Sequence, residues 1–242
     1  MTIRTTRVTK RVIAAVATAA LGATLLALPT TPASATATVT VSTTQGADRY
    51  ATSNALAVKN AGGATTETIF VLASGEAFAD GLAASSMAGA LGATLLLTPQ
   101  ASLPNSVLST MLALSSTAAS RNVVIIGGEA AVSADVAATL TSVGFTVNRV
   151  QGADRYATAN AAAAQTKLSN TNIGLFAGKR TAFLTSGIGF ADAVSASGWA
   201  FENKHPIFLT DGTTLSAETA AAMVAAGVQQ VIVLGGTLAV SD

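Results

Sequence analysis

The chain has 242 residues, 50% of them hydrophobic and 5% aromatic, with no cysteine and a formal net charge of +1. The absence of cysteine excludes a disulfide framework, so the fold must depend on a packed core. The high share of small aliphatic residues excludes a disordered or low-complexity stalk. The balanced charge excludes bulk electrostatic attraction to nucleic acid.

The first 35 residues have the pattern of a secretory signal peptide. A basic segment at residues 4–11 precedes an apolar run at 12–28, and an A-x-A cleavage motif stands at 33–35. The run is shorter than the roughly 20 residues that span a bilayer, so we expect export without a membrane anchor. Four of the 13 basic residues lie in this segment, which leaves 9 basic against 12 acidic residues. Local arginines or lysines must therefore meet any anionic partner.

One octapeptide, QGADRYAT, stands at residues 45–52 and again, unchanged, at 151–158. Further segments recur in the same order: 72–80 as 184–192, 94–98 as 206–210, and 124–128 as 232–236. The chain is therefore a tandem duplication. We expect a signal peptide at 1–35, a first repeat at 36–150 and a second repeat at 151–242.

Short aliphatic runs alternate with longer alanine-rich segments in the first repeat. We predict strands at 68–73, 94–98, 123–126 and 145–150, and helices at 80–91, 103–115 and 133–143. Continuously apolar strands that alternate with helices indicate a parallel sheet covered on both faces. We therefore predict tandem three-layer α/β units with mainly parallel sheets and a Rossmann- or flavodoxin-like topology.

The second repeat follows the same order from residue 183 and stops after Gly235-Gly236. It lacks a segment that matches 133–150, so this second unit is predicted to be incomplete. An apolar sheet with an uncovered edge associates readily. We expect a third repeat or another chain to complete it.

The repeated loops follow strands, where ligands bind in open α/β sheets. Backbone N–H groups at the following helices could cradle an anion or a sugar. Alternatively, the glycines only allow tight turns, and the acidic residues complement the helix dipole. The candidate residues are Ser74, Gly75, Phe78, Asp80, Ser186, Gly187, Phe190 and Asp192, with the turn glycines Gly127, Gly128, Gly235 and Gly236.

The Asp-Arg-Tyr triplets of the octapeptides are the second group of candidates: Asp48, Arg49, Tyr50, Asp154, Arg155 and Tyr156. The aspartates can accept backbone N–H groups at the start of the next helix. The arginines offer planar donors for carboxylate, phosphate or sugar hydroxyls, and the tyrosines offer a flat face for a sugar ring. Alternatively, each Asp–Arg pair holds its loop or the contact between the repeats.

Catalytic groups are scarce. The single histidine, His205, stands opposite Ala93 in the other repeat, and we expect it at the surface. Glu76 and Asp80 could form an acid–base pair, but Glu76 is replaced by Ile188 in the second repeat. No cysteine, H-x-x-E, nucleophile elbow or phosphate-binding glycine motif is present. We predict no catalytic residue, no metal and no cofactor.

The motifs G-x-D-R-Y-x-T, S-G-x-x-F-A-D, an aliphatic strand ending in Leu-Thr, and an aliphatic strand ending in Gly-Gly occur twice in that order. This pattern resembles the cell wall-binding repeat 2 family of Gram-positive bacteria. The resemblance implies compact α/β repeats, usually three around a pseudo-threefold axis, that hold secreted proteins to anionic wall polymers. It also implies polymer binding by the strand segments Leu95, Leu96, Leu97, Ile207, Phe208 and Leu209.

The sequence thus favours a secreted, non-catalytic module that binds an anionic, teichoic acid-like glycopolymer. Arg49 and Arg155 would supply local positive charge, with Arg121 and Arg149 as further candidates. Two alternatives remain. The chain is the targeting part of a wall hydrolase, an N-acetylmuramoyl-L-alanine amidase, or it is a surface-layer protein that assembles with itself.

Overall fold

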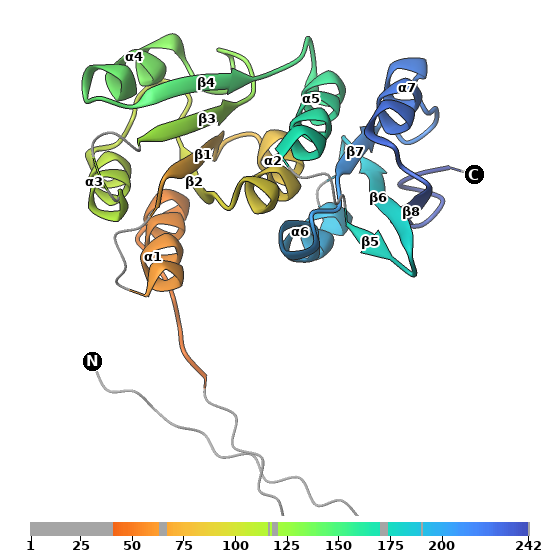
Figure 1. The fold of residues 1–242 in the computed structure, drawn as a ribbon, viewed down its shortest axis with the longest axis horizontal. Helices are drawn as coiled ribbons and strands as arrows, with labels where there is room; N and C mark the ends of the chain where they lie inside the picture. The colour runs from red at the N-terminus through yellow and green to blue at the C-terminus, as the bar shows by residue number, and fades with distance from the viewer. Residues whose placement is uncertain are drawn as a thin grey trace, which may run out of the picture. The chain divides into compact units, whose positions relative to one another are not determined.

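The computed structural model describes residues 41–62, 67–115, 117, 121–169, 174–189 and 191–241. The expected signal peptide lies outside these residues. Residues 44–242 form one compact unit that contains both repeats (Figure 1). Within the described ranges, no helix is long and apolar enough to cross a membrane.

The first repeat is a parallel α/β unit, as predicted. Its four strands lie in the order β2-β1-β3-β4, and all three pairings are parallel. Apart from the first helix, for which no range is predicted, the observed elements start and end within two residues of the predicted ones. They are α1 (Arg49–Ala61), β1 (Ile69–Ser74), α2 (Phe78–Leu91), β2 (Thr94–Thr98), α3 (Asn105–Leu114), β3 (Asn122–Ile126), α4 (Ala134–Ser142) and β4 (Thr146–Val150).

The second repeat forms a smaller sheet in which β6 pairs in parallel with β7 on one side and β8 on the other. An unpredicted short strand, β5, joins β6 as an antiparallel hairpin. The hairpin turns at Ala177 and Gly178, which both have positive φ. The elements are α5 (Arg155–Ser169), β5 (Leu175–Phe176), β6 (Lys179–Ser186), α6 (Ala191–Asn203), β7 (Ile207–Thr210), α7 (Ala217–Ala226) and β8 (Gln230–Leu234).

Successive side chains of a strand point to opposite sides of its sheet, and those of β1 are buried on both sides. In β1, Phe70 and Leu72 point toward α3 and α4, whereas Val71 and Ala73 belong to the core on the other side. The second repeat has a small outer core beneath α7, where Met223 contacts the face that includes Phe208. The continuously apolar strands therefore match their two-sided burial.

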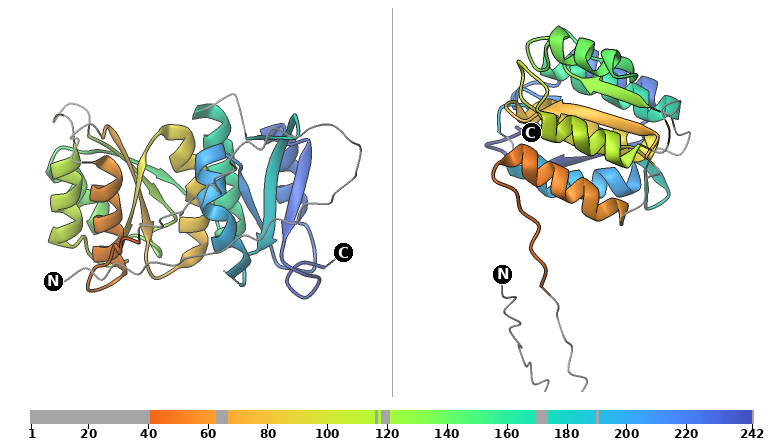
Figure 2. Two further views of the ribbon diagram at one scale, coloured as in Figure 1. Left: turned by 90° about the horizontal axis from the view of Figure 1, so that it is seen from below. Right: turned by 90° about the vertical axis from the view of Figure 1, so that its left-hand side faces the viewer.

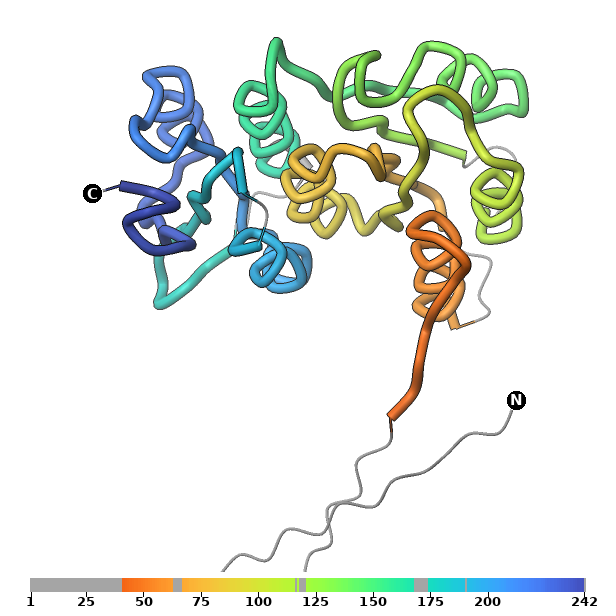
Figure 3. Tube along the Cα trace, turned by 180° about the vertical axis from the view of Figure 1, so that it is seen from behind, coloured from red at the N-terminus to blue at the C-terminus, as the bar shows by residue number. Residues whose placement is uncertain are grey.

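Helix α2 lies in the core that the two repeats share. It packs against α5 and α6 of the second repeat, and Figures 2 and 3 show it beside α5. Ala83, Ala84 and Ala88 are buried in this core. At Gly89 a Cβ atom would lie 1.9 Å from the carbonyl oxygen of Phe201, so only glycine allows α6 this close. Small residues on α2 therefore bring the repeats together.

The outer face of β8 is open, in agreement with the expected sheet edge. Val231 is 38% exposed and Val233 is 50% exposed, whereas their counterparts in β3, Val123 and Ile125, are fully buried. The difference arises because α4 and β4 cover β3, and the described part of the second repeat has no counterpart of these two elements. The two repeats thus differ in how completely their sheets are covered.

This difference predicts unequal effects of one substitution at two matched valines. Val123→Ala should lower the free energy of unfolding by about 2 kcal/mol, because it removes buried methyl groups and leaves a cavity. Val231→Ala should cost about 0.5 kcal/mol, as is usual for a partly exposed side chain. Urea denaturation of both variants measures this. Equal losses would show that the outer face of β8 is covered in solution.

Candidate functional site

The octapeptide fixes the start of the helix that follows it. Asp48 Oδ1 accepts the backbone N–H of Ala51 at 2.7 Å, which caps α1. The hydroxyl of Thr52 accepts the N–H of Gly46 at 3.0 Å and closes the loop on itself. The second repeat has the same bonds, from Ala157 to Asp154 at 2.8 Å and from Gly152 to Thr158 at 3.0 Å. The repeated polar residues therefore serve the backbone in both copies.

The arginine and tyrosine of each octapeptide hold the loop that follows β1 in the first repeat and β6 in the second. Arg49 Nη1 donates to the carbonyl oxygen of Gly75, and Arg155 Nη1 donates to that of Gly187 at 2.6 Å. The Tyr50 ring lies so close to Gly75 that a Cβ there would be 2.5 Å from Cε1. Burial raises the pKa of Tyr50, and the charge of Glu76 adds to this effect.

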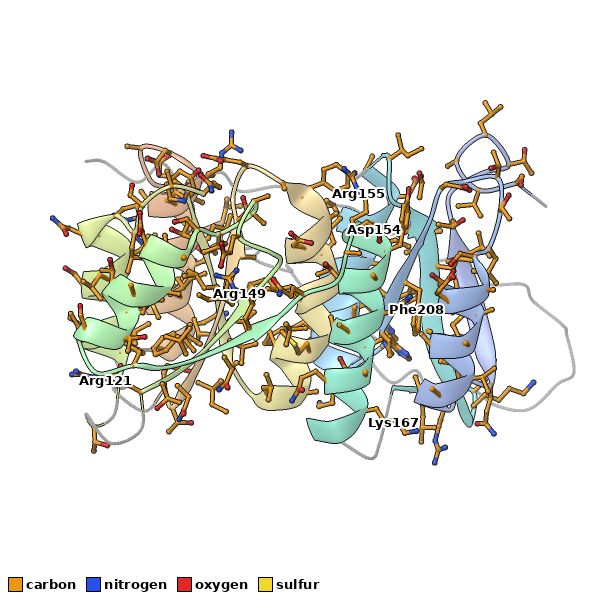
Figure 4. All side chains as sticks on the ribbon, turned by 90° about the horizontal axis from the view of Figure 1, so that it is seen from above. Arg121, Arg149, Asp154, Arg155, Lys167 and Phe208 are labelled. Atoms are coloured by element: carbon orange, nitrogen blue, oxygen red, sulfur yellow. The ribbon has the colours of Figure 1, made fainter. Side chains whose placement is uncertain are left out.

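All four candidate arginines donate to backbone carbonyl groups. Arg149 Nη1 donates to Gly127 at 2.7 Å, and Arg121 Nη1 donates to Val143 at 3.3 Å with its guanidinium over the Phe145 ring. Figure 4 shows Arg149 and Arg155 on different elements and Arg155 beside Asp154. Arg49 and Arg155 are exposed. A guanidinium has five N–H donors, so these contacts leave donors for another partner.

The serines that end β1 and β6 accept hydrogen bonds from N–H groups that we expected to bind a ligand. Ser74 Oγ accepts the N–H groups of Glu76 at 3.1 Å and Ala77 at 3.4 Å. Ser186 Oγ accepts those of Ile188 and Gly189 at the same two distances. Each loop is thus closed by its own serine. Phe78 begins α2, and Phe190 lies outside the described residues.

The Gly-Gly turns leave room for an aspartate. Gly127 has φ 95° and Gly235 has φ 110°, which favour glycine. A Cβ at Gly127 would lie 2.5 Å from Asp80 Oδ2, and the equivalent distance from Gly235 to Asp192 Oδ2 is 2.7 Å. Burial raises the pKa of Asp80, and the positive charge of Arg155 opposes this shift. Gly128 and Gly236 are the second residues of these turns.

The two aliphatic strand segments differ between the repeats. Ile207 and Leu209 of β7 are 1% exposed, in the shared core to which α2 contributes. Their counterparts Leu95 and Leu97 of β2 are half-buried and line a groove of about 810 Å³. The groove runs between α1, α2, β2 and α6, and Arg49 lines it. Leu96 and Phe208 point to the opposite faces of their sheets and are fully buried.

The expectation of a surface histidine is wrong. His205 is 1% exposed, and its Nδ1 lies 2.9 Å from the carbonyl oxygen of Thr181. Its ring packs edge-on against Phe183 and parallel to Trp199. Sequence reasoning missed this because Ala93 occupies the equivalent position in the first repeat. Within the described ranges, no group of three or more His, Cys, Asp or Glu residues could hold a metal ion.

The contact of Arg155 with Gly187 predicts a structural effect. Arg155→Ala should lower the free energy of unfolding by about 1 kcal/mol, because the carbonyl loses a charged donor in a partly solvated loop. Lys179→Ala, at an exposed cation in β6, should change it by less than about 0.5 kcal/mol. Thermal melts followed by circular dichroism compare the two. If Arg155→Ala melts like the native chain, Arg155 does not hold the loop.

Comparison with known proteins agrees with the two structural repeats. The chain is 27% identical over 197 residues to N-acetylmuramoyl-L-alanine amidase LytC of Bacillus subtilis (strain 168), covering 81% of this chain and 36% of that protein. Among solved structures, Cwp8 from Clostridium difficile is 30% identical, with a TM-score of 0.68 over 81% of this chain and 31% of that one. The chain thus spans about a third of the length of each.

A second solved structure, Cwp6 from Clostridium difficile, has a TM-score of 0.71 at 24% identity. The matched region covers 82% of this chain and 29% of Cwp6, and the match agrees with the α/β fold described above. The sequence profile of cell wall binding domain 2 (CWB2) matches residues 43–137 and 149–242. These two matches coincide with the two repeats, and the chain belongs to the CWB2 family.

Proposed function

We propose that this chain is a secreted, non-catalytic module that attaches to the Gram-positive cell wall by binding an anionic, teichoic acid-like glycopolymer. The observation that carries the proposal is the CWB2 match to both repeats. The proposal includes a leader at 1–35 that is removed, followed by repeats at 36–150 and 151–242. The proposed partner is a cell-wall component, and the proposed location is the cell wall.

The groove of the first repeat is the site that we propose for the polymer. Leu95 and Leu97 form an apolar floor that accepts the C–H groups of sugar rings, whereas the equivalent side chains of the second repeat are covered. Arg49 lies at the rim, where its remaining N–H groups can donate to an anionic group. Residues 36–242 have fewer basic than acidic residues, so an anionic polymer must be bound by a local basic side chain such as Arg49.

A second candidate function follows from the amidase that the chain resembles. The chain aligns with 36% of that protein, so a chain of this type could be the targeting part of a wall hydrolase. Zymography on peptidoglycan tests this alternative directly. We expect no clearing by this chain, and a cleared band would show that it has hydrolytic activity.

A self-assembling surface protein is the third candidate. The observation in its favour is the exposed outer face of β8, where Val231 and Val233 could contact a neighbouring chain. Multi-angle light scattering of residues 36–242 measures the mass in solution. A defined assembly that fails to bind walls would favour this function over wall attachment.

The proposed function predicts binding to walls that depends on their polymers. Residues 36–242 should co-sediment with purified Gram-positive walls, and acid extraction of the anionic polymers should abolish the binding. A folded protein that sediments with neither preparation would contradict wall attachment. Equal binding to both preparations would identify peptidoglycan as the ligand instead.

The groove assignment predicts the effect of one substitution. Leu97→Gln should weaken wall binding about tenfold, because a polar amide replaces part of the apolar floor. Val224→Gln, at a side chain of α7 that is 78% exposed, is the matched control and should bind like the native chain. Circular dichroism must show that both variants are folded. Undiminished binding by Leu97→Gln would place the polymer elsewhere.

A further inference from the structure

Asp80 is a largely buried aspartate in the first turn of α2. It is 8% exposed. The counterpart in the second repeat, Asp192, is exposed. Burial disfavours the charged form of the Asp80 carboxylate, and the charge of Arg155 compensates only in part. Its place in the first turn of α2 favours a negative charge through the helix dipole, whereas its burial opposes that charge.

The carboxylate of Asp80 lines a cavity of about 420 Å³ that both repeats build. The first turn of α2, the turn at 128–131 and the octapeptide residues at 152–158 surround it. A cavity of this size is within the range that small ligands occupy in proteins.

The charged side chains of the cavity indicate which chemical groups it can bind. Four ionisable side chains line it, namely Glu76, Asp80, Asp154 and Arg155. Asp154 caps α5, and Arg155 donates to Gly187, so both already bind the backbone. The acidic surplus opposes phosphate or carboxylate groups, whereas hydroxyl groups donate readily to carboxylates. Ala77, Phe78 and Ala131 add an apolar wall that suits the C–H face of a sugar ring.

We propose that this cavity binds a neutral, hydroxyl-rich sugar residue, with Asp80 as the acceptor of its hydroxyl groups. The proposal rests on the proposed function in taking the wall glycopolymer as the source of the sugar. The groove at Leu95 and the cavity at Asp80 then have different tasks. The groove binds the anionic part of the polymer beside Arg49, and the cavity binds a neutral sugar ring.

The binding test uses neutral monosaccharides released from purified Gram-positive walls by acid hydrolysis. Saturation-transfer difference NMR should detect at least one of them on residues 36–242, and Asp80→Asn should reduce its affinity about tenfold. Asp135→Asn, an exposed carboxylate in the first turn of α4, is the control and should leave the signals unchanged. No signal with the native chain, or equal signals with Asp80→Asn, would overturn the proposal. A response to inorganic phosphate alone would also overturn it.

Stability separates a ligand site from a structural carboxylate. At pH 7, Asp80→Asn should raise the Tm, because it removes a charge that burial disfavours in the folded protein. The folded state holds the Asp80 proton more tightly than the unfolded chain does, so the penalty grows as pH rises above 3.8. The gain should therefore vanish below pH 3.8. A lower Tm for Asp80→Asn at pH 7 would show that the carboxylate stabilises α2 and would overturn the proposal.

Sedimentation with intact walls separates failure of this inference from failure of the proposed function. If the native chain does not sediment with walls, wall attachment itself is wrong. If it sediments but no sugar signal depends on Asp80, attachment stands and the cavity is not its sugar site.

Discussion

The close packing of α2 against the second repeat is the contact on which the rest of the structure depends. This helix meets the inner face of its own sheet and also α5 and α6, so it has no face left for large polar side chains. Alanine, serine and glycine fill it because only small side chains allow helix axes to approach on several sides at once. A buried pair of hydroxyls, Ser86 and Thr166, lies 3.4 Å apart between α2 and α5. The small residues in the sequence of α2 fit this geometry.

The octapeptide shows that identical loops can be repeated for structural reasons. In both copies an aspartate caps the helix, a threonine closes the loop, and an arginine and a tyrosine hold the loop after β1 or β6. The same residues become part of a binding surface only where neighbouring elements form a wall beside them. The second octapeptide lines the cavity at Asp80, whereas Arg49 of the first lines the groove at Leu95. Identical sequences therefore have different surroundings in the two repeats.

The fold could be predicted because local signals and packing agree. The apolar run 68–73, for example, contributes to strand β1, which is covered on both faces, and Ser133 caps α4 directly before its first residue. The partners of the arginines could not be predicted, because backbone carbonyls from other loops leave no pattern in the sequence. The burial of His205 depends on Trp199 and Phe183, which have no equivalent aromatic residues in the first repeat. The cavity at Asp80 depends on how the repeats pack, which composition does not encode.

The order of α2, α5 and α6 along the chain has a consequence for how the protein is made. Translation proceeds from the N-terminus, so α2 is synthesised before both helices that cover it. Its apolar surface stays open to water and to other chains until the second repeat has emerged. The first sheet can form early, but the final burial of α2 waits for residues far downstream. A nascent chain that pauses between α4 and α5 therefore exposes this apolar surface until the second repeat docks.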